Sequence, residues 1–279
     1  LKGMRSINDL DKIASSFSTT EKMPVLFLGH GSPMNAIEEN QFVTGFRNLA
    51  QNLPKPNAIL CVSAHWFTKG SKVTAMEMPK TIHDFGGFPK ELFEVQYPAH
   101  GSPELATITQ ELLLPTVVEL DHHWGLDHGA WSVIKHLYPK ADIPVIQLSI
   151  DYSKPAEYHF QLAQQLSRLR EKGILIIGSG NIIHNLRLVD FYNFEKDDYG
   201  YDWAIEARAR INSLLLDGNF QPLLEYEKQS QAFQLAIPTP EHFLPLIYTL
   251  GLKDKSEEIQ LFNDKLVAGS LSMTSVRIG

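Results

Sequence analysis

Short apolar runs alternate with helical segments along this chain, and this alternation constrains the fold more than any other feature of the sequence. Runs rich in Val, Ile and Leu are predicted to be strands buried on both faces, over 24–29, 58–64, 145–150 and 174–178. Helices are predicted between and after them, over 41–52, 103–114, 129–138, 155–171 and 201–216. Strands joined through helices need crossover connections, so the sequence predicts an α/β fold whose central sheet is mostly parallel or mixed and is flanked by helices.

The chain has no internal repeat, low-complexity tract or Pro/Gly/Ser-rich linker that would divide its 279 residues. A single domain is therefore predicted over 23–279, after an N-terminal leader over 1–22 that we expect to be loosely ordered. The last segment, 269–279, alternates with a period of two. It is predicted to be a strand that forms an edge pair with 258–262.

Charge and cysteine content exclude several classes of protein. The formal net charge is −7 and basic residues are not clustered, which argues against a nucleic-acid partner. No apolar stretch approaches the roughly 20 residues that span a bilayer, so no membrane partner is expected. The single cysteine, Cys61, excludes an intrachain disulfide and a cysteine-based zinc site, and it favours a reducing, cytoplasmic location.

The chain contains 11 histidines, most of them within short motifs. His30 and His65 each follow a predicted strand, in GHGSP and SAHW, and His184 follows another in GSGNIIHNL. Ligands bind at the carboxyl ends of strands in such sheets, so these side chains can converge in one crevice. Taken singly, the motifs also fit a solvated turn or a core histidine held by one backbone hydrogen bond.

Two further motifs carry histidines. PTPEHFLPL places His242 on a predicted helix that opens after two prolines, beside Glu241, and either side chain is a candidate ligand; a helix cap with an exposed imidazole is the alternative. His128, in DHHWGLDHGAW, precedes a predicted helix in a Trp-rich stretch that is typical of a pocket wall. Surface positions are expected for His100, His122, His123, His136 and His159.

Several histidines at strand ends, with no cysteine ligand available, favour an imidazole-rich site for zinc or iron. The stretch 81–106 has no clear period and is predicted to be a long loop over the strand ends. Its residues Phe85, Phe88 and Tyr97 are candidates to contact a substrate ring, although core packing explains each equally well. The glycines at 178 and 180 also suggest a phosphate-binding loop, but the motif has no lysine and lacks the spacing of either nucleotide fingerprint.

The sequence resembles the class III extradiol ring-cleaving dioxygenases of the DOPA dioxygenase type, through motifs that occur in the same order. They are GHGSP, SAHWF, TIHDFGGFP, YPAHGSP, DHGAW, ADIPVIQLSID, GSGNIIHNLR and PTPEHFLPL. The resemblance covers the chain from about Met23 to Gly279. It implies one α/β domain with a mononuclear non-haem metal site. The implied reaction inserts both atoms of O2 into a catechol such as DOPA and gives a muconic semialdehyde.

The resemblance also implies roles for individual histidines. His30, His65 and His242 correspond to metal ligands. His184 lies at the metal, either as a fourth ligand or as the acid/base that handles the substrate proton. His128 corresponds to a second active-site histidine that hydrogen-bonds bound oxygen or substrate. The predicted catalytic residues are therefore His128 and His184.

The implied cofactor is one divalent metal ion per chain, Fe(II) for activity or Zn(II). Protocatechuate-cleaving relatives use two histidines and a glutamate, whereas the matching motif here offers His242 with Glu241 beside it. Neighbours on a helix point about 100° apart, so both are not expected to bind. A set of neutral imidazoles does not offset the charge of iron as a carboxylate would, and it also suits zinc.

Two other classes of function are compatible with the same residues. A zinc-dependent hydrolase would use the same histidines to lower the pKa of a bound water. A non-catalytic metal-binding relative on the same scaffold is the other alternative. For the dioxygenase we expect a small-molecule catechol and O2 as partners, a role in aromatic-compound catabolism, and a monomer or small homo-oligomer.

Overall fold

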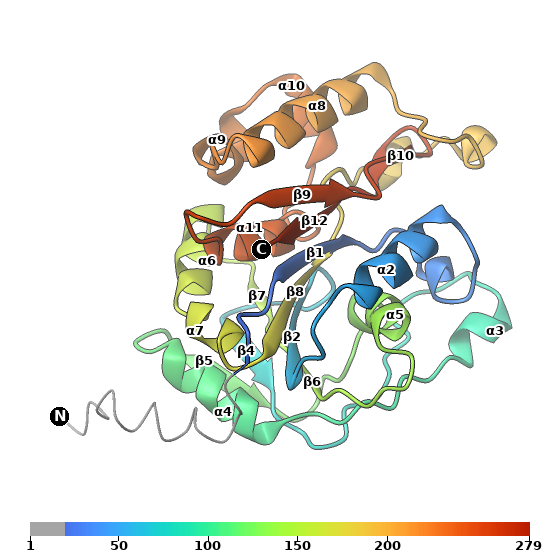
Figure 1. Ribbon diagram of the computed structural model, residues 1–279. Helices are drawn as coiled ribbons and strands as arrows, with labels where there is room; N and C mark the ends of the chain where they lie inside the picture. The colour runs from blue at the N-terminus through green and yellow to red at the C-terminus, as the bar shows by residue number, and fades with distance from the viewer. Residues whose placement is uncertain (1–19) are drawn as a thin grey trace.

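The computed structural model describes residues 20–279, and a six-stranded sheet forms the centre of this part of the chain (Figure 1). The strands, in their order across the sheet, are β6 (Val145–Gln147), β2 (Ala58–Ser63), β8 (Ile174–Gly180), β1 (Val25–Gly29), β12 (Ser275–Ile278) and β9 (Ile259–Phe262). The first four are parallel, and β12 and β9 add antiparallel pairs at the β1 side. The predicted mixed α/β sheet is confirmed, as is the pairing of the C-terminal strand with 258–262.

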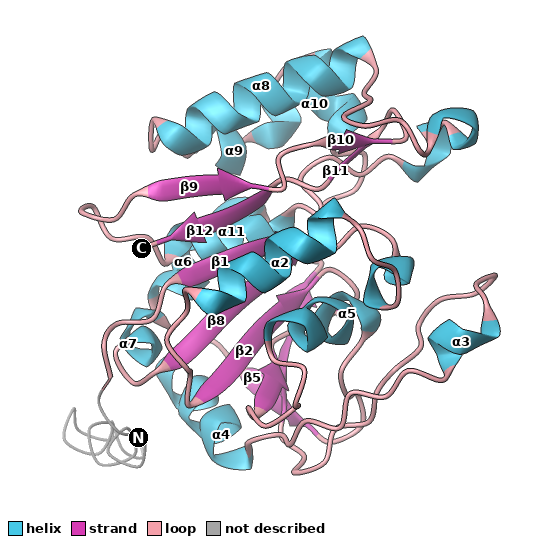
Figure 2. Ribbon diagram, turned by 45° about the vertical axis from the view of Figure 1, so that its right-hand side comes forward, coloured by secondary structure: helices cyan, strands magenta, loops and turns pink. Residues whose placement is uncertain are grey.

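Helices cover both faces of this sheet (Figures 1 and 2). One face carries α2 (Gln41–Gln51) and α5 (His128–Leu137), and the other carries α6 (Ala156–Gln164), α7 (Ser167–Arg170) and α11 (Leu244–Gly251). Successive residues of β1 point to opposite faces of the sheet. Leu26 and Leu28 therefore pack on the face covered by α2 and α5, and Phe27 packs on the face covered by α6, α7 and α11. Burial on both faces explains why β1, β2 and β8 are continuous apolar runs.

The remaining elements surround this sandwich. A group of helices lies beyond β9 (Figure 1), namely α8 (Asp202–Leu216), α9 (Gln221–Leu224) and α10 (Gln231–Ala236). The other helices are α3 (Lys90–Phe93) and α4 (Pro103–Leu112), with 3₁₀ turns at Pro33–Ala36, Leu186–Leu188, Phe191–Asn193 and Tyr226–Lys228. Short strand pairs are β3 (Phe67–Thr68) with β7 (Ile150–Asp151), β4 (Ser71–Thr74) with β5 (Val118–Asp121), and β10 (Leu266–Val267) with β11 (Leu271–Ser272). No helix within residues 20–279 is long and apolar enough to cross a membrane.

Several predicted elements are divided in the structure. The run 145–150 forms β6 and then leaves the central sheet to pair with β3 as β7. The predicted helix 155–171 is interrupted between α6 and α7, and the predicted strand 269–279 forms β11 and β12. The stretch 81–106 contains α3 and the start of α4 rather than loop alone. Residues 1–19 of the predicted leader, 1–22, lie outside the described residues.

The surface prediction is confirmed for His100, His122 and His123 but is wrong for two other histidines. His159 is fully buried between α6 and α11, with Nδ1 3.0 Å from the hydroxyl of Tyr248, and burial lowers its pKa to about 4. His136 is also buried, with Nε2 2.7 Å from the carbonyl oxygen of Asn35. Both side chains point from their helices into the core of the protein, where a single polar partner satisfies one ring nitrogen.

Candidate metal centre and active site

The predicted site histidines converge at the carboxyl end of the parallel strands. His30 directly follows β1, His65 follows β2 and His184 follows β8, while His128 begins α5 and His242 precedes α11. Ring centroids lie 3.8 Å apart for His65 and His128, and 5.1 Å apart for His30 and His65. His242 lies 5.3 Å from His30 and 5.1 Å from His65 by the same measure. The structure therefore brings together residues that are far apart in the sequence.

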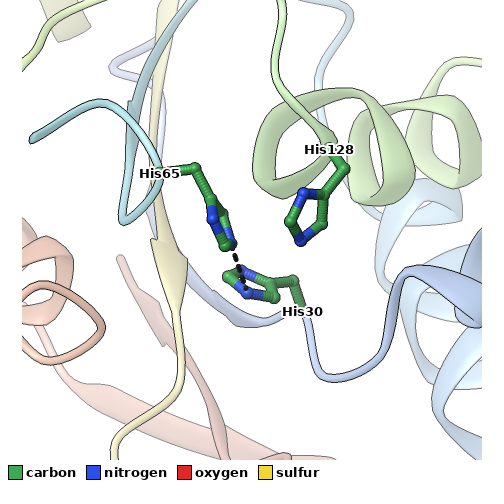
Figure 3. Close-up of side chains that lie close together, drawn as sticks. All are labelled: His30, His65 and His128. Atoms are coloured by element: carbon green, nitrogen blue, oxygen red, sulfur yellow. Dashed lines mark hydrogen bonds between the residues drawn. The ribbon is translucent and has the colours of Figure 1, made fainter. Parts of the chain in front are cut away.

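Hydrogen bonds determine which nitrogen of His30 is protonated. The hydroxyl of Ser179, at the end of β8, donates to the carbonyl oxygen of Gly129, so its oxygen is left to accept from Nδ1 of His30 at 3.0 Å. A neutral imidazole carries one N–H, so Nε2 of His30 has a free lone pair. That atom lies 3.3 Å from Nε2 of His65. Figure 3 shows the two rings pointing toward each other.

His65 is oriented in the same way by a carboxylate. Oδ2 of Asp84 lies 3.5 Å from Nδ1 of His65 and favours the proton on that nitrogen, which leaves Nε2 free toward His30. Two lone pairs at 3.3 Å repel each other unless a proton or a cation lies between them. An ion about 2.1 Å from each of two imidazole nitrogens, at a tetrahedral angle, separates those nitrogens by about 3.4 Å. The pair therefore fits a metal ion.

His128 is placed by the start of α5. Its neighbour Asp127 is fully buried and caps the helix, and its carboxylate also accepts from Ser63 Oγ at 2.6 Å and from Gln147 Nε2 at 2.7 Å. Oδ1 of Asp84 accepts from the backbone N–H of His128 at 2.9 Å, and Nδ1 of the His128 ring lies 2.9 Å from the same oxygen. Asp84 thus lies between His65 and His128 and positions both rings.

His242 lies in the turn before α11, not on the helix that the sequence predicts. Nδ1 of its ring faces the carboxylate of Glu241 at 3.3 Å, and its backbone carbonyl accepts from the N–H of Asn181. The helical angle that would separate Glu241 from His242 does not apply in this turn. The carboxylate instead orients the imidazole and leaves Nε2 available to a ligand.

The ring of His184 stacks face to face on that of His242, with centroids 3.5 Å apart and 11° between the planes. An imidazole lone pair lies in the plane of its ring, so an ion bound by His242 lies outside the plane of His184. Ligand atoms of His184, Glu241 and His242 lie within 4.8 Å of one another, but the stacked ring planes do not meet at one ion. His184 can bind the ion together with His242 only if its ring turns out of the stack.

The glycines of the GSG motif explain how these segments approach. A Cβ on Gly180 would collide with the carbonyl oxygen of His242, and a Cβ on Gly178 would collide with that of Pro245. The absence of side chains lets the turn that carries His242 lie directly on β8. The motif therefore serves close backbone contact at the histidine cluster, and the phosphate alternative has no support here.

Burial keeps the imidazoles neutral. It lowers the pKa of His65 and of His184 to about 4. The pKa of His30 and of His242 falls well below the usual 6.5, mainly because burial removes water from the charged form and secondarily because neighbouring imidazoles repel a second charge. Metals bind the neutral imidazole, so the cluster is in its metal-binding form at neutral pH.

A cavity of about 1130 Å³ opens over the histidines and includes His30, His65, His128, His184 and His242 in its lining. The three aromatic candidates from 81–106 differ in their position relative to this cavity. Phe88 lines the cavity, and Phe85 packs against His128 with ring centroids 5.5 Å apart. Tyr97 is buried in the core, where its hydroxyl donates to the carbonyl oxygen of Tyr138. Core packing is thus the correct interpretation for Tyr97.

Other groups at the site carry no pattern that predicts them from the sequence. Ser179 and Asp84 act through contacts with residues 149 and 44 positions away, respectively. The segment 186–198 also lines the cavity and was not expected there. Its repeated aromatic residues next to the GSGNIIHNL motif are the one sequence feature that could have indicated it.

Comparisons with known proteins agree with this geometry. Residues 24–277 match the family described as the catalytic LigB subunit of aromatic ring-opening dioxygenase. The chain is 49% identical over 265 residues to a protein of Escherichia coli strain K12 named 4,5-DOPA dioxygenase extradiol, covering 94% of this chain and 96% of that protein. It is 36% identical over 258 residues to a protein of the same name from Beta vulgaris, covering 90% and 94%. A crystal structure of an uncharacterized Escherichia coli K12 protein superposes with a TM-score of 0.79 at 45% identity, covering 92% of this chain and 100% of that one.

Proposed function

Because this chain belongs to the family of catalytic LigB subunits of aromatic ring-opening dioxygenases, we propose that its histidine cluster holds one divalent metal ion and opens a catechol such as DOPA beside its two hydroxyl groups. The observation that carries the proposal is the pair of Nε2 atoms of His30 and His65, which face each other 3.3 Å apart at the cavity. The names of the relatives at 49% and 36% identity support a DOPA-like substrate.

We assign His30, His65 and His242 as the ligands. Each neutral ring has an oxygen group at Nδ1, from Ser179, Asp84 and Glu241 respectively, which fixes the ring and presents Nε2. The family is that of a metal-dependent dioxygenase, and Fe(II) is the ion we propose for activity, with Zn(II) able to bind the same nitrogens. Such an ion, when bound, supplies the positive charge that holds an anionic catechol and O2 next to each other.

We assign His184 and His128 to the substrate, although His128 also offers a nitrogen within 4.8 Å of those of His30 and His65. His184 lines the cavity with its ring stacked on His242, and we assign it the proton that a catechol hydroxyl loses on binding. Its pKa is lowered to about 4 by burial, but a bound catecholate beside it would raise its proton affinity. His128, held through Asp84, is placed to hydrogen-bond the oxygen or the ring substituents. A role for His184 as a fourth ligand would require its ring to leave the stack.

The proposal is tested by loading metal-free protein with Fe(II) under anaerobic conditions, adding DOPA or simpler catechols, and then admitting O2. We expect oxygen uptake together with a yellow semialdehyde. Protein loaded with Zn(II) should bind the catechol without consuming oxygen, because zinc has no redox chemistry. No product and no oxygen uptake with Fe(II) across the catechol panel would contradict the proposal, and turnover that needs no oxygen would favour a hydrolase.

We further propose that this reaction serves aromatic-compound catabolism in the cytoplasm. The one cysteine, Cys61, is a free thiol buried in β2, which supports a reducing location. The small-molecule partners in this proposal are the catechol and O2.

A further inference from the structure

The cavity over the histidines is larger than a DOPA-sized catechol requires. Its volume is about 1130 Å³, whereas pockets of roughly 300–1000 Å³ enclose ligands of drug size. Of the lining histidines, His30, His128 and His242 are buried, and the catechol hydroxyls would be held at this buried part of the cavity. The outer part of the cavity is therefore left for another portion of the substrate.

One wall of this outer part consists of apolar side chains that are exposed to solvent. Four of these residues form what we call the outer wall, and all of them line the cavity: Leu186, Val189, Phe191 and Phe194. Phe191 is 79% exposed, Leu186 63% and Phe194 41%. Large apolar side chains gathered on an exposed surface next to a cavity are typical of a ligand-binding site.

The outer wall is anchored to the rest of the domain. Asp190 accepts from the backbone N–H of Tyr192 and from the hydroxyl of Tyr199, and its own N–H donates to the carbonyl oxygen of Ala268. At the far end, Lys265 pairs with the carboxylate of Asp197 at 2.6 Å. A segment held at Asp190 and Asp197 can present its aromatic rings to a ligand with a smaller entropy cost of ordering.

Other residues of the cavity lining are also apolar. They are Met34, Phe42, Phe88 and Leu271, and all four are partly buried. A substituent that extends from the catechol ring toward solvent would contact these residues and the outer wall. Each methylene that it buries there is worth up to about fourfold in affinity.

The charge at the rim favours an uncharged substituent over an anionic one. Acidic residues of the cavity lining outnumber the basic one. The acidic residues are Glu38, Glu39, Glu195, Asp197 and Asp198, and the basic one is Lys196. Basic side chains behind the lining pair with Glu39, Asp197 and Asp198. A substrate carboxylate at this rim would still meet like charge from Glu38 and Glu195.

We propose that the part of the cavity lined by the outer wall is a subsite for an extended, uncharged apolar substituent, so that the enzyme opens catechols considerably larger than DOPA. This inference rests on the function proposed for the histidine cluster and specifies the substrate class of that same site.

The test compares kcat/KM for ring opening by the Fe(II)-loaded enzyme on 4-methylcatechol, 4-hexylcatechol and a catechol with a carboxylate at the end of a chain of the same length. We expect 4-hexylcatechol to exceed 4-methylcatechol by at least roughly tenfold, through a lower KM. The carboxylate-terminated catechol should lose most of this gain. Equal kcat/KM for the methyl and hexyl substrates would overturn the proposal.

A pair of neighbouring variants locates the effect. In Phe191→Ala the ratio of hexyl to methyl kcat/KM should fall to about a third of the wild-type ratio or less. In Tyr192→Ala the ratio should be unchanged, because Tyr192 is 100% exposed and does not line the cavity. Equal ratios in the two variants would contradict a subsite at the outer wall.

Binding of 4-hexylresorcinol separates this inference from the proposed function. It has no adjacent hydroxyls and cannot be opened as a catechol, so calorimetry measures its binding whether or not the enzyme turns over. Tighter binding than unsubstituted resorcinol, weakened by Phe191→Ala, supports the subsite even if no catechol is cleaved. No gain from the hexyl chain overturns the subsite, even if short catechols are opened.

Discussion

Polar side chains are buried at both ends of the central sheet, but they are satisfied in different ways. Near the amino ends of the strands, the guanidinium of Arg170 is 1% exposed. It donates to the carbonyl oxygens of Met23 and Leu252 and to both carboxylate oxygens of Glu257. At the carboxyl ends, the Nε2 atoms of His30 and His65 face each other, while their Nδ1 atoms face Ser179 and Asp84.

The difference separates groups that are buried for stability from groups that are buried for chemistry. The Arg170–Glu257 pair meets its requirements within the chain, and hydrogen bonds with Arg170 and its surroundings lower the pKa of Glu257 to about 2 despite burial. The imidazoles are kept neutral by burial, and their ring nitrogens point at a cavity. Buried groups with perturbed pKa values and unpaired atoms are typical of functional sites.

The strongest test of this difference removes one of the two facing Nε2 atoms. His65→Ala should abolish ring opening, because only one of the two facing Nε2 atoms remains, while the free energy of unfolding of the metal-free protein stays the same or rises. Oxygen uptake and urea denaturation measure the two effects. Marked destabilisation of the metal-free variant would show that His65 serves the fold rather than the chemistry.

Removing one partner at the other end should have the opposite effect. Glu257→Gln leaves the buried guanidinium of Arg170 without its counter-charge and should cost about 3 kcal/mol of unfolding free energy, with activity per folded molecule unchanged. Glu39→Gln is the matched control, since Glu39 pairs with Arg47 at the exposed surface. Its denaturation midpoint should equal that of the wild type, and an equal loss in both variants would contradict a special role for burial.

A smaller effect is expected from the residue that orients two of the imidazoles. Asp84→Asn keeps the shape of the side chain but removes the charge beside Nδ1 of His65, and it should weaken metal affinity by about 10- to 100-fold. Asp84→Asn should be rescued at high metal concentration, and a metal titration followed by activity measures this. Unchanged metal affinity would mean that Asp84 acts only on the backbone of His128.

The dependence of stability on pH also distinguishes the two ends. The pKa of His65 and of His184 is lowered from 6.5 to about 4, so the unfolded metal-free chain binds more protons between these values and stability falls as pH drops from about 6.5 to 4. Glu257, lowered from 4.5 to about 2, adds a further loss only below about pH 4.5. Urea denaturation should show that Glu257→Gln reduces the pH dependence of the unfolding free energy only below about pH 4.5. A reduced pH dependence between about pH 6.5 and 4.5 in that variant would contradict the assignment to Glu257.

The sequence predicts well what depends on local pattern. The strands and helices follow from apolar runs and helical spacing, and so does the position of His30, His65 and His184 after the ends of strands. Spacing also suggested a helix around His242, but the chain makes a turn after Pro240 before α11 begins at Leu244.

Contacts between distant segments explain what the sequence did not predict. Asp84 acquires its role only when the stretch after β4 folds against α5. His159 looks polar in the sequence, yet it packs against Tyr248 on a helix that is distant in the chain. The outer wall has no periodicity, and its apolar residues become part of a site only because the segment crosses the cavity.

The central claim is that one divalent ion binds between the facing nitrogens of His30 and His65. Anaerobic calorimetric titration of metal-free protein with Fe(II), followed by X-ray absorption of the loaded protein, tests it most directly. The account predicts one ion per chain with imidazole nitrogens at about 2.1 Å, and no tight binding in the double variant His30→Ala, His65→Ala. Stoichiometric binding that survives in the double variant, or a loaded spectrum without imidazole scattering, would contradict it.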